Sequence, residues 1–283
     1  MQDLRLAGRK SAAQRTLVQA GDVCIGGDRV VLIAGPCTIG APAETGEILR
    51  ALGGTAVAMV RGGAWKPRTS PWSYQGPGLE GLQSFSRAAA GSGYGVVTEV
   101  MEAGCISQAE PLATMLQVGS RNMQNFDLLR ALGRSRRPVL LKRGLSATLS
   151  EFLYAAEYIL AGGNPSVVLC ERGIRSFDDH TRNVLDLGAV VALKQLTHLP
   201  VIVDPSHACG RREMVADLSL AAVACGADGL LIEAHPRPEQ SISDARQTIS
   251  TDDLAALCPR LEAVAATRGR HLADRREKIA VGR

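Results

Sequence analysis

Aromatic side chains are scarce in this sequence: phenylalanine, tryptophan and tyrosine make up only 4% of the 283 residues, although 46% of the residues are hydrophobic. The core must therefore consist mainly of valine, leucine, isoleucine and alanine, a composition typical of alanine-rich helices packed on strands of branched residues. The length and the apolar content suit one large domain, and α/β barrels of this size occur as single domains.

The sequence also lacks the signals of secretion, of membrane insertion and of a disulfide framework. No apolar run reaches the ~18 residues of a membrane span, and Met1–Thr16 has no apolar stretch of the kind found in secretory signals. The cysteines are odd in number, scattered and without a CxxC pair, which argues against a disulfide framework and a zinc ribbon. They are Cys24, Cys37, Cys105, Cys170, Cys209, Cys225 and Cys258. We therefore expect a cytoplasmic protein with reduced thiols and no membrane partner.

Long runs of one charge are absent, apart from a small cluster of Arg275, Arg276 and Lys278 near the C-terminus. The formal net charge of +4 is too mild to indicate nucleic acid as a partner, and we interpret the cluster as part of a solvated tail. No linker rich in proline or serine divides the chain. We predict three segments: an N-terminal tail over 1–16, a catalytic barrel over 17–266 and a basic tail over 267–283.

Short, nearly continuous apolar runs recur along the chain, each followed by an amphipathic helical pattern. The predicted strands are Val30–Ala34, Val57–Val60, Gly95–Glu99, Met115–Val118, Val139–Lys142, Ser166–Cys170, Val201–Asp204 and Gly229–Glu233. The predicted helices include Glu44–Leu52, Leu79–Ala90, Phe126–Leu132, Leu149–Leu160, Thr181–Leu196 and Arg212–Cys225. Such strands are buried on both faces, so eight of these units predict a closed (β/α)8 TIM barrel, with an open doubly wound sheet as the alternative. Before them, Leu17–Gly27 predicts a β-hairpin that caps the barrel floor, with Gly26 and Gly27 as its turn.

Cationic side chains gather at the predicted carboxyl ends of several strands, where barrel enzymes carry their active sites. These cations are Arg61, Lys66, Arg68, Arg121, Lys142, Arg143 and Arg172. So many like charges at one barrel mouth would repel each other without anionic ligands, and arginine and lysine bind phosphate and carboxylate well. The pattern predicts a ligand with two phosphates, or with one phosphate and one carboxylate. For one or two of these cations, an ion pair with barrel glutamates such as Glu99 or Glu171 is the alternative.

A second group of side chains at strand ends has the chemistry of metal ligands. Cys37, His207 and Glu233 follow or end the first, seventh and eighth predicted strands, and Asp244 lies in the last loop. One thiolate, one imidazole and two carboxylates suit a divalent ion such as Mn, Fe, Co or Zn. Taken singly, Cys37 is better explained as a small buried hydrophobic residue, and a structural role would explain His207 equally well. The set is more specific than its members, because all four fall at strand ends or in the adjoining loop.

The chain contains five long stretches with distinctive motifs: RGGAWKPRTSPWSYQGPGLEGL, GSRNMQNFDLL, PVLLKRGLSATLSEFLYAAEYIL, GNPSVVLCERGIRSFD and LTHLPVIVDPSHACGRR. These stretches resemble the family of 3-deoxy-D-arabino-heptulosonate 7-phosphate (DAHP) synthases, in the class that shares ancestry with the 3-deoxy-manno-octulosonate 8-phosphate (KDO8P) synthases. The resemblance runs from about Val23 to Thr248, and these motifs are very specific. The segment Lys66–Ser70 reads KPRTS, where the KDO8P branch has a sequence like KANRSS, which favours a four-carbon acceptor over arabinose 5-phosphate.

The resemblance implies a function and a role for each site residue. The enzyme would be a transferase that condenses phosphoenolpyruvate with erythrose 4-phosphate, to give DAHP and phosphate for aromatic biosynthesis. The implied metal ligands are Cys37, His207, Glu233 and Asp244, and the implied phosphoenolpyruvate contacts are Arg61, Lys66, Arg121, Lys142 and Arg172. Arg68, Thr69 and Ser70 would hold the phosphate of erythrose 4-phosphate. Among the catalytic candidates Cys37, His207, Lys66 and Asp204, we interpret Lys66 as a proton donor and Asp204 as a group that orients water or ligand. Family members of this kind are usually homodimers or homotetramers.

The sequence departs from the family pattern at two places beside the implied metal site. After the GPC motif, Gly40 stands where the family usually has a glutamate, and Ala245 with Arg246 stands where the family usually has glycine and proline. Alanine does not easily adopt φ > 0, so the loop path is expected to differ, and Arg246 is a cation that would bind an anion or oppose the metal. Two further hypotheses therefore remain open: a homologue with a different acceptor or altered chemistry in a specialised pathway, and an inactive paralogue that binds a phosphorylated ligand.

Overall fold

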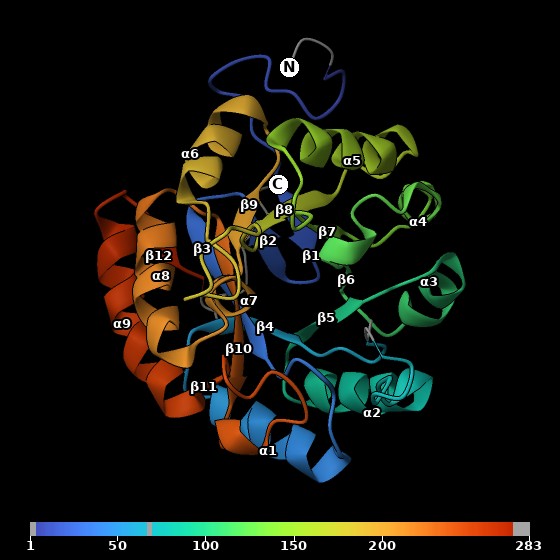
Figure 1. The fold of residues 1–283 in the computed structure, drawn as a ribbon, viewed down its shortest axis with the longest axis vertical. Helices are drawn as coiled ribbons and strands as arrows, with labels where there is room; N and C mark the ends of the chain where they lie inside the picture. Colours follow the sequence, from blue (N-terminus) through green and yellow to red (C-terminus); the bar gives the residue numbers. More distant parts are fainter. Residues whose placement is uncertain (1–3, 67–69, 274–283) are drawn as a thin grey trace.

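The structure is a computed structural model that describes residues 4–66 and 70–273. Eight parallel strands form a closed barrel, because β10 pairs with β3 as well as with β9 (Figure 1). The barrel strands are β3 Arg29–Gly35, β4 Val57–Arg61, β5 Gly95–Glu99, β6 Met115–Val118, β7 Val139–Lys142, β8 Val167–Glu171, β9 Val201–Val203 and β10 Gly229–His235. The predicted (β/α)8 barrel is therefore confirmed, and the open sheet is wrong.

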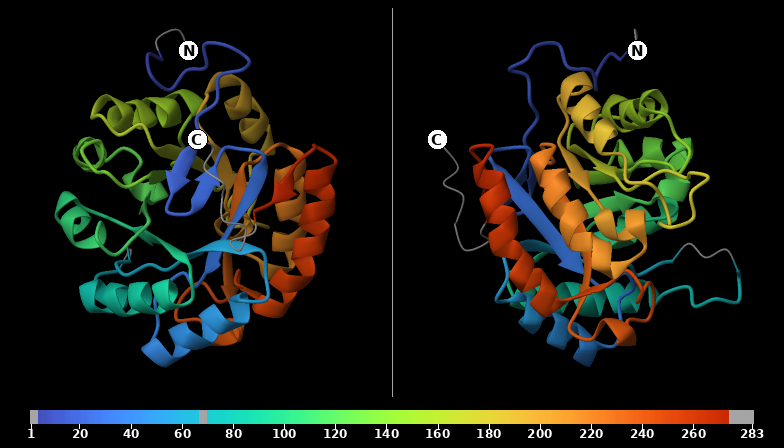
Figure 2. Two further views of the ribbon diagram at one scale, coloured as in Figure 1. Left: turned by 180° about the vertical axis from the view of Figure 1, so that it is seen from behind. Right: turned by 60° about the vertical axis from the view of Figure 1, so that its left-hand side comes forward.

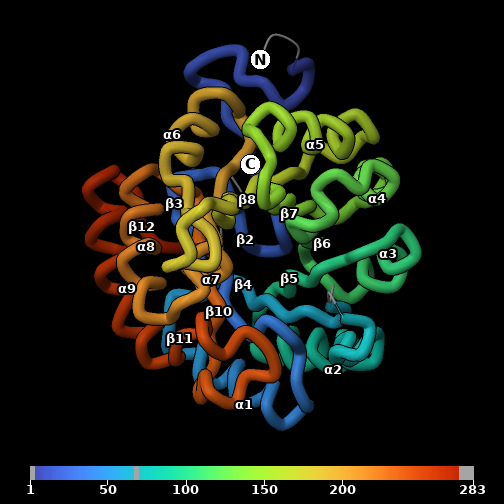
Figure 3. The backbone as a smooth tube through the Cα atoms, in the orientation of Figure 1, coloured from blue at the N-terminus to red at the C-terminus, as the bar shows by residue number. Residues whose placement is uncertain are grey.

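Helices surround the strands, and Figure 3 shows the chain alternating between the inner strands and this outer layer. The outer helices are α1 Pro42–Leu52, α2 Gly78–Gly91, α3 Ala103–Ala109, α4 Phe126–Leu132, α5 Leu149–Ala161, α6 Leu187–Leu196, α8 Arg212–Ala224 and α9 Thr251–Ala266. Smaller elements are the helix α7 Pro205–Cys209, the 3-10 turns Ser120–Asn122 and Pro238–Gln240, and the strand β11 Ile249–Ser250. None of the helices in these ranges is both long enough and apolar enough to cross a membrane.

One predicted helix begins later than its sequence pattern indicates. The pattern covers Thr181–Leu196, but the helix α6 begins at Leu187, where Asp186 caps its first turn by accepting a hydrogen bond from the backbone of Ala189. The six residues before it form a loop. Val184 in this loop pairs with Ile174 in an antiparallel bridge, so its backbone N–H and carbonyl groups bond to Ile174 and not to residues of a helix. The loop lies over the barrel mouth and contributes to the site described below.

The N-terminal hairpin is confirmed, but its turn is not where it was predicted. Strands β1 Val18–Ala20 and β2 Val23–Ile25 are joined through Gly21, which has a φ of 61°, whereas Gly26 and Gly27 follow the second strand. The side chains of these strands pack into one buried cluster with the barrel interior, including Val31, Leu140 and Leu231. Figure 2 shows the hairpin from behind, at the centre of the barrel. It closes the end of the barrel opposite the site.

The chain segments before and after the barrel in the sequence both contact it. The backbone N–H groups of Leu6 and Ala7 donate to Glu157 Oε1 on α5, at 2.7 and 2.6 Å. Gly8 forms a bridge with Thr197 after α6. At the other end, the strand β12 His271–Leu272 pairs with β3. Residues 274–283, which include most of the predicted basic tail, lie outside the described part of the chain.

Candidate metal and anion site

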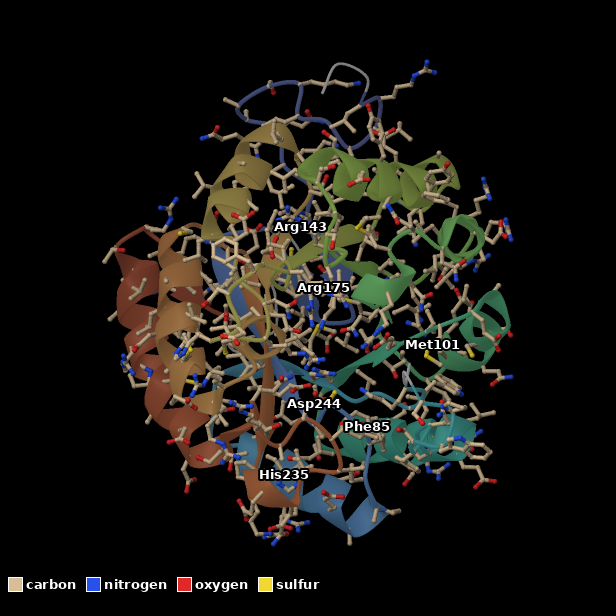
Figure 4. The ribbon with its side chains drawn as sticks, in the orientation of Figure 1. Phe85, Met101, Arg143, Arg175, His235 and Asp244 are labelled. Atoms are coloured by element: carbon tan, nitrogen blue, oxygen red, sulfur yellow. The ribbon has the colours of Figure 1, made fainter. Side chains whose placement is uncertain are left out.

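The carboxyl ends of the barrel strands surround one pocket, and Figure 4 labels two of its lining residues, Arg175 and Asp244. Its lining brings together most of the residues selected from the sequence. These are Cys37, Arg61, Lys66, Arg121, Lys142, Arg172, His207 and Asp244. Glu233 lies directly beneath them and is fully buried. The candidate metal ligands and the candidate anion ligands therefore share one mouth of the barrel.

The four candidate metal ligands form a compact cluster. One ligand atom from each of Cys37, His207, Glu233 and Asp244 lies within 4.8 Å of the other three. The Cys37 Sγ is 3.9 Å from His207 Nε2, which in turn is 3.2 Å from Glu233 Oε1. A single ion with bonds of about 2.0–2.3 Å to nitrogen, oxygen and sulfur fits among atoms at such separations. The donor set and its spacing therefore fit a divalent metal.

Asp204 determines how His207 faces the cluster. It is the N-cap of α7, where Oδ1 accepts the backbone N–H of His207 at 2.9 Å. Its other oxygen lies 2.7 Å from His207 Nδ1. An ionised carboxylate only accepts hydrogen bonds, so Nδ1 carries the proton and the Nε2 lone pair faces the metal ligands. Burial lowers the pKa of His207, which favours the neutral imidazole that binds metals.

The Cys37 thiol is buried and keeps its proton in the metal-free protein. Burial raises its pKa to about 12, and the nearby Glu233 adds to this effect, whereas Lys66 and Arg61 oppose it. The Lys66 ammonium donates hydrogen bonds to Cys37 Sγ at 2.9 Å and to the Cys37 carbonyl oxygen at 3.0 Å. Because the thiolate is the form that binds metals, binding of an ion here must release this proton.

Asp244 has an unusual backbone conformation, with a φ of 59°, and it is the one non-glycine residue with positive φ in the described chain. Burial acts to raise its pKa, but His207, the Cys37 thiol and Arg182 together lower the pKa well below its usual value, so the carboxylate is ionised. The positive φ in this loop falls on Asp244 and not on Ala245, so the alanine adopts no conformation that is unfavourable for it. Arg246, which was expected to affect the metal or an anion, is exposed and does not line the pocket.

The other departure from the family pattern has a counterpart in the structure. A Cβ atom at Gly40 would lie 1.7 Å from Glu44 Oε2, so the carboxylate of Glu44 occupies the place of a side chain at position 40. Glu44 Oε1 is 2.9 Å from His235 Nε2. The His235 Nδ1 accepts the backbone N–H of Arg237, so Nε2 is the donor to Glu44. A carboxylate is thus present here even though residue 40 is glycine.

The cations at the barrel mouth differ in their partners. Arg61 donates to Glu233 at 3.0 Å, and Lys142 lies 2.5 Å from Asp204. Arg172 is 5% exposed, and its Nη1 has no hydrogen-bond partner within the described ranges. Burial lowers the pKa of Arg172, and the charges of Arg182 and Arg121 act in the same direction. A buried guanidinium nitrogen without a partner, among other cations, points to an anionic ligand.

Arg143 does not belong to the pocket. It donates to Glu171 at 2.8 Å, to Asp186 at 3.1 Å and to the carbonyl oxygen of Ala147. Its guanidinium is therefore neutralised inside the wall of the barrel. The ion pair with a barrel glutamate that was allowed as an alternative for one or two cations is correct for Arg143, and Arg61 also pairs with such a glutamate, Glu233, while it lines the pocket.

Three predicted contacts to erythrose 4-phosphate lie at the edge of the described chain. Arg68 and Thr69 fall outside the described residues. Ser70 is exposed, and its hydroxyl oxygen accepts the backbone N–H of Trp72. Ser70 does not line the pocket in the part of the chain that the structure describes.

The structure adds pocket residues that the sequence reading missed. Arg175, Arg182 and Asn183 line the pocket from the loop between β8 and α6. Arg182 also forms an ion pair with Asp244 at 3.1 Å. The helical pattern assigned to Thr181–Leu196 hid two of these residues. Their position after a strand end was the signal that could have found them, because loops after barrel strands carry the site.

Comparison with known proteins agrees with this geometry. Residues 10–266 match the profile of the DAHP synthetase I family. A phospho-2-dehydro-3-deoxyheptonate aldolase from Thermotoga maritima is 43% identical over 265 residues, covering 94% of this chain and 78% of the relative. A 2-dehydro-3-deoxyphosphooctonate aldolase from Geobacter sulfurreducens is 31% identical over 268 residues, covering 88% of this chain and 97% of the relative.

A solved structure is also similar over most of the fold. The crystal structure of the phospho-2-dehydro-3-deoxyheptonate aldolase (DAHP synthase) of Thermotoga maritima superposes with a TM-score of 0.91 at 42% identity, covering 95% of this chain and 78% of that one. The profile match spans nearly the whole barrel, and the identity to the Thermotoga relative holds over almost all of the chain. The chain therefore belongs to the DAHP synthetase I family.

Proposed function

We propose that this protein condenses phosphoenolpyruvate with erythrose 4-phosphate, in a metal-dependent reaction that yields DAHP and phosphate. The observation that carries the proposal is the juxtaposition of two features in one pocket. A cluster of four metal-binding side chains within 4.8 Å lies beside Arg172, whose buried Nη1 has no partner among the described residues. The family membership and the similarity to a DAHP synthase support the same reaction.

The metal would be held by Cys37, His207, Glu233 and Asp244. Their mixture of thiolate, imidazole and carboxylate suits Mn, Fe, Co or Zn better than Mg or Ca, which prefer oxygen ligands alone. When bound there, such an ion supplies a Lewis acid that polarises the aldehyde oxygen of the acceptor. Asp204 supports this role from behind, because it keeps the Nε2 of His207 free of a proton.

Phosphoenolpyruvate would be bound by Arg61, Lys66, Arg121, Lys142 and Arg172, which line the pocket from β4 to β8. Arg61 and Lys142 are already held by buried carboxylates, so their positions are fixed before a ligand arrives. Such preorganised cations orient an anionic substrate and stabilise negative charge that develops during the reaction. Arg172 supplies a donor, Nη1, that has no partner among residues 4–66 and 70–273.

The phosphate of erythrose 4-phosphate would be bound by Arg68, Thr69 and Ser70, after the end of β4. C3 of phosphoenolpyruvate forms a bond to the aldehyde carbon, water adds at C2, and phosphate leaves. Lys66, whose ammonium reaches Cys37, is our candidate for the proton donor to the oxygen of the former aldehyde. Asp204 would orient the water or the substrate.

The test is an assay of phosphate release from phosphoenolpyruvate with added Mn²⁺, comparing erythrose 4-phosphate with arabinose 5-phosphate. We expect turnover with erythrose 4-phosphate only, and loss of that turnover in the presence of a chelator. Turnover with arabinose 5-phosphate instead would favour the homologue with a changed acceptor. Binding of phosphoenolpyruvate without turnover on either aldehyde would favour the inactive paralogue.

We also propose that the catalytic unit is the barrel over 17–266, and that it acts in the cytoplasm as a homodimer or homotetramer. The cysteines of the described chain are all free thiols, as a reducing compartment requires. An exposed aromatic surface on α4 and α5, around Phe126 and Tyr154, supports assembly because such patches commonly mark protein contacts. Light scattering of the purified protein tests this, and a monomeric mass at working concentration would contradict it.

A further inference from the structure

Arg182 lies beside the candidate metal ligands, where its backbone contacts the C-terminal end of α7. Its N–H donates to the carbonyl oxygen of Cys209 at 2.9 Å, at the end of α7. The next residue of α7's C-terminus is Gly210, which has a φ of 68°. A Cβ atom at Gly210 would lie 2.6 Å from the Cβ of Arg182, so only glycine lets the arginine pack this closely. The same short helix that carries His207 therefore also seats Arg182.

The side chain of Arg182 joins two of the four candidate ligands through one more residue. Its Nη1 donates to Asp244 Oδ1 and to Gln247 Oε1, each at 3.1 Å. Gln247 is 3% exposed, and its Nε2 donates to Glu233 Oε2 at 2.7 Å. The amide orientation of Gln247 is determined on both sides, because its oxygen faces a donor and its nitrogen faces a carboxylate. The result is a continuous chain of hydrogen bonds from Asp244 through Arg182 and Gln247 to Glu233.

We propose that Arg182 and Gln247 are positioning residues that hold Asp244 and Glu233 at the separation a metal ion requires. The inference rests on the metal site of the proposed function. Asp244 needs such support, because its backbone has a left-handed conformation that non-glycine residues rarely adopt. Neither positioning residue belongs to the four-ligand cluster itself. Hydrogen-bonded partners of metal ligands commonly determine both the orientation of the ligand and the affinity for the metal.

Charge alone makes the opposite prediction for Arg182. A cation so close to a divalent ion repels it, so removal of the arginine should strengthen metal binding if its charge is what matters. Removal should weaken metal binding if the hydrogen bonds to Asp244 and Gln247 are what matters. Arg175 provides the matched control, since it also lines the pocket but has no side-chain bond to a candidate ligand among the contacts of the described residues.

The experiment measures the dissociation constant of Mn²⁺ for the metal-free protein by isothermal titration calorimetry, without substrates. We expect Arg182→Met to bind Mn²⁺ about 10- to 100-fold more weakly than the wild type, with partial recovery in Arg182→Lys. Arg175→Met should bind Mn²⁺ at least as tightly as the wild type. Equal or tighter binding by Arg182→Met, or equal weakening by Arg175→Met, would overturn the positioning role.

Gln247→Leu gives a second test that leaves the net charge unchanged. We expect weaker binding of Mn²⁺ here too, and a double variant no weaker than the more affected single variant, because both residues belong to one chain of bonds. Should Arg182→Met fail to fold, as judged by circular dichroism, Gln247→Leu decides by the same criterion, and unchanged affinity rejects the inference. If the wild type itself does not bind Mn²⁺, the proposed metal site fails and the positioning role fails with it. If the wild type binds Mn²⁺ and the variants bind it equally tightly, the metal site stands and the positioning role alone is wrong.

Discussion

The substitution Asp204→Asn changes one buried atom and should have a large effect. Three donors converge on the Asp204 carboxylate: the backbone N–H of His207 on Oδ1, and His207 Nδ1 with Lys142 Nζ on Oδ2. Asparagine has a single acceptor oxygen. Whichever way its amide turns, its NH₂ group faces at least one of these donors, and Lys142 loses its counter-charge.

The magnitude follows from the burial of the pair. Lys142 is 4% exposed and Asp204 is fully buried, so water replaces the lost carboxylate poorly. Breaking a buried ion pair by removing one partner costs about 3–5 kcal/mol, and we expect the free energy of unfolding at neutral pH to fall by that amount. We also expect weaker binding of Mn²⁺, because the amide no longer determines which nitrogen of His207 carries the proton.

The loss of unfolding free energy caused by Asp204→Asn should decrease as the pH falls. Burial acts to raise the pKa of Asp204, but His207 and Lys142 hold the pKa well below its usual value. A carboxyl whose pKa is lower in the folded state than in the unfolded chain stabilises the fold above the unfolded value, about 3.9, and that stability is lost as the pH falls through the lower folded value. The difference between wild type and Asp204→Asn should therefore be largest near neutrality and should shrink in strong acid.

Urea denaturation without metal, followed by circular dichroism, measures this difference. Asp217→Asn is the matched control, because its ion pair with Arg260 is exposed and contributes little to stability. If Asp204→Asn unfolds within about 0.5 kcal/mol of the wild type, the range of neutral surface substitutions, the argument from the buried pair is refuted.

Three further predictions concern other parts of the site. Mn²⁺ should bind more tightly as the pH rises, because the Cys37 thiol, with its pKa of about 12, must lose a proton when the ion binds. Cys37→Ala should abolish this pH dependence, as measured by calorimetry in buffers of different ionisation enthalpy, and most of the turnover in the phosphate assay. Arg143→Met should lower the free energy of unfolding by about 3–5 kcal/mol and leave the affinity for phosphoenolpyruvate unchanged. A large loss of that affinity would mean that Arg143 binds the substrate after all. Gly40→Ala should cost about 1 kcal/mol in urea denaturation by displacing the Glu44 carboxylate, and it should cost nothing in a Glu44→Ala background.

The barrel could be predicted from the sequence because its strands are buried on both faces. A strand such as Val139–Lys142 is a nearly continuous apolar run, which predicts a parallel strand covered on both faces, and eight such units favour a closed barrel over an open sheet. Short elements could not be predicted in this way. The helix α7 has only five residues, too few for a helical period, and it forms because Asp204 caps its start and Pro205 occupies its first position.

The kinds of residue at the site could also be predicted, but their partners could not. Arg143 and Arg172 both follow the end of a buried strand in the sequence, and nothing local distinguishes them. In the fold, Arg143 points to Glu171 and Asp186 inside the wall, whereas Arg172 lines the pocket. The sequence likewise did not indicate that the Glu44 carboxylate approaches Gly40, or that Asp244 and not Ala245 has a positive φ.

The sequence by itself determined the alternation of strand and helix, and the chemistry at each strand end, because both depend on local hydrophobic pattern and residue type. Only the tertiary structure decided which charges neutralise one another, and it alone brought Arg182 and Gln247 behind the metal ligands. Arg182 and Asp244 are 62 positions apart in the chain, yet their side chains are 3.1 Å apart. Ion pairs and hydrogen bonds depend on distances of a few ångströms and on side-chain direction, and a closed barrel determines both by bringing together loops that are distant in sequence.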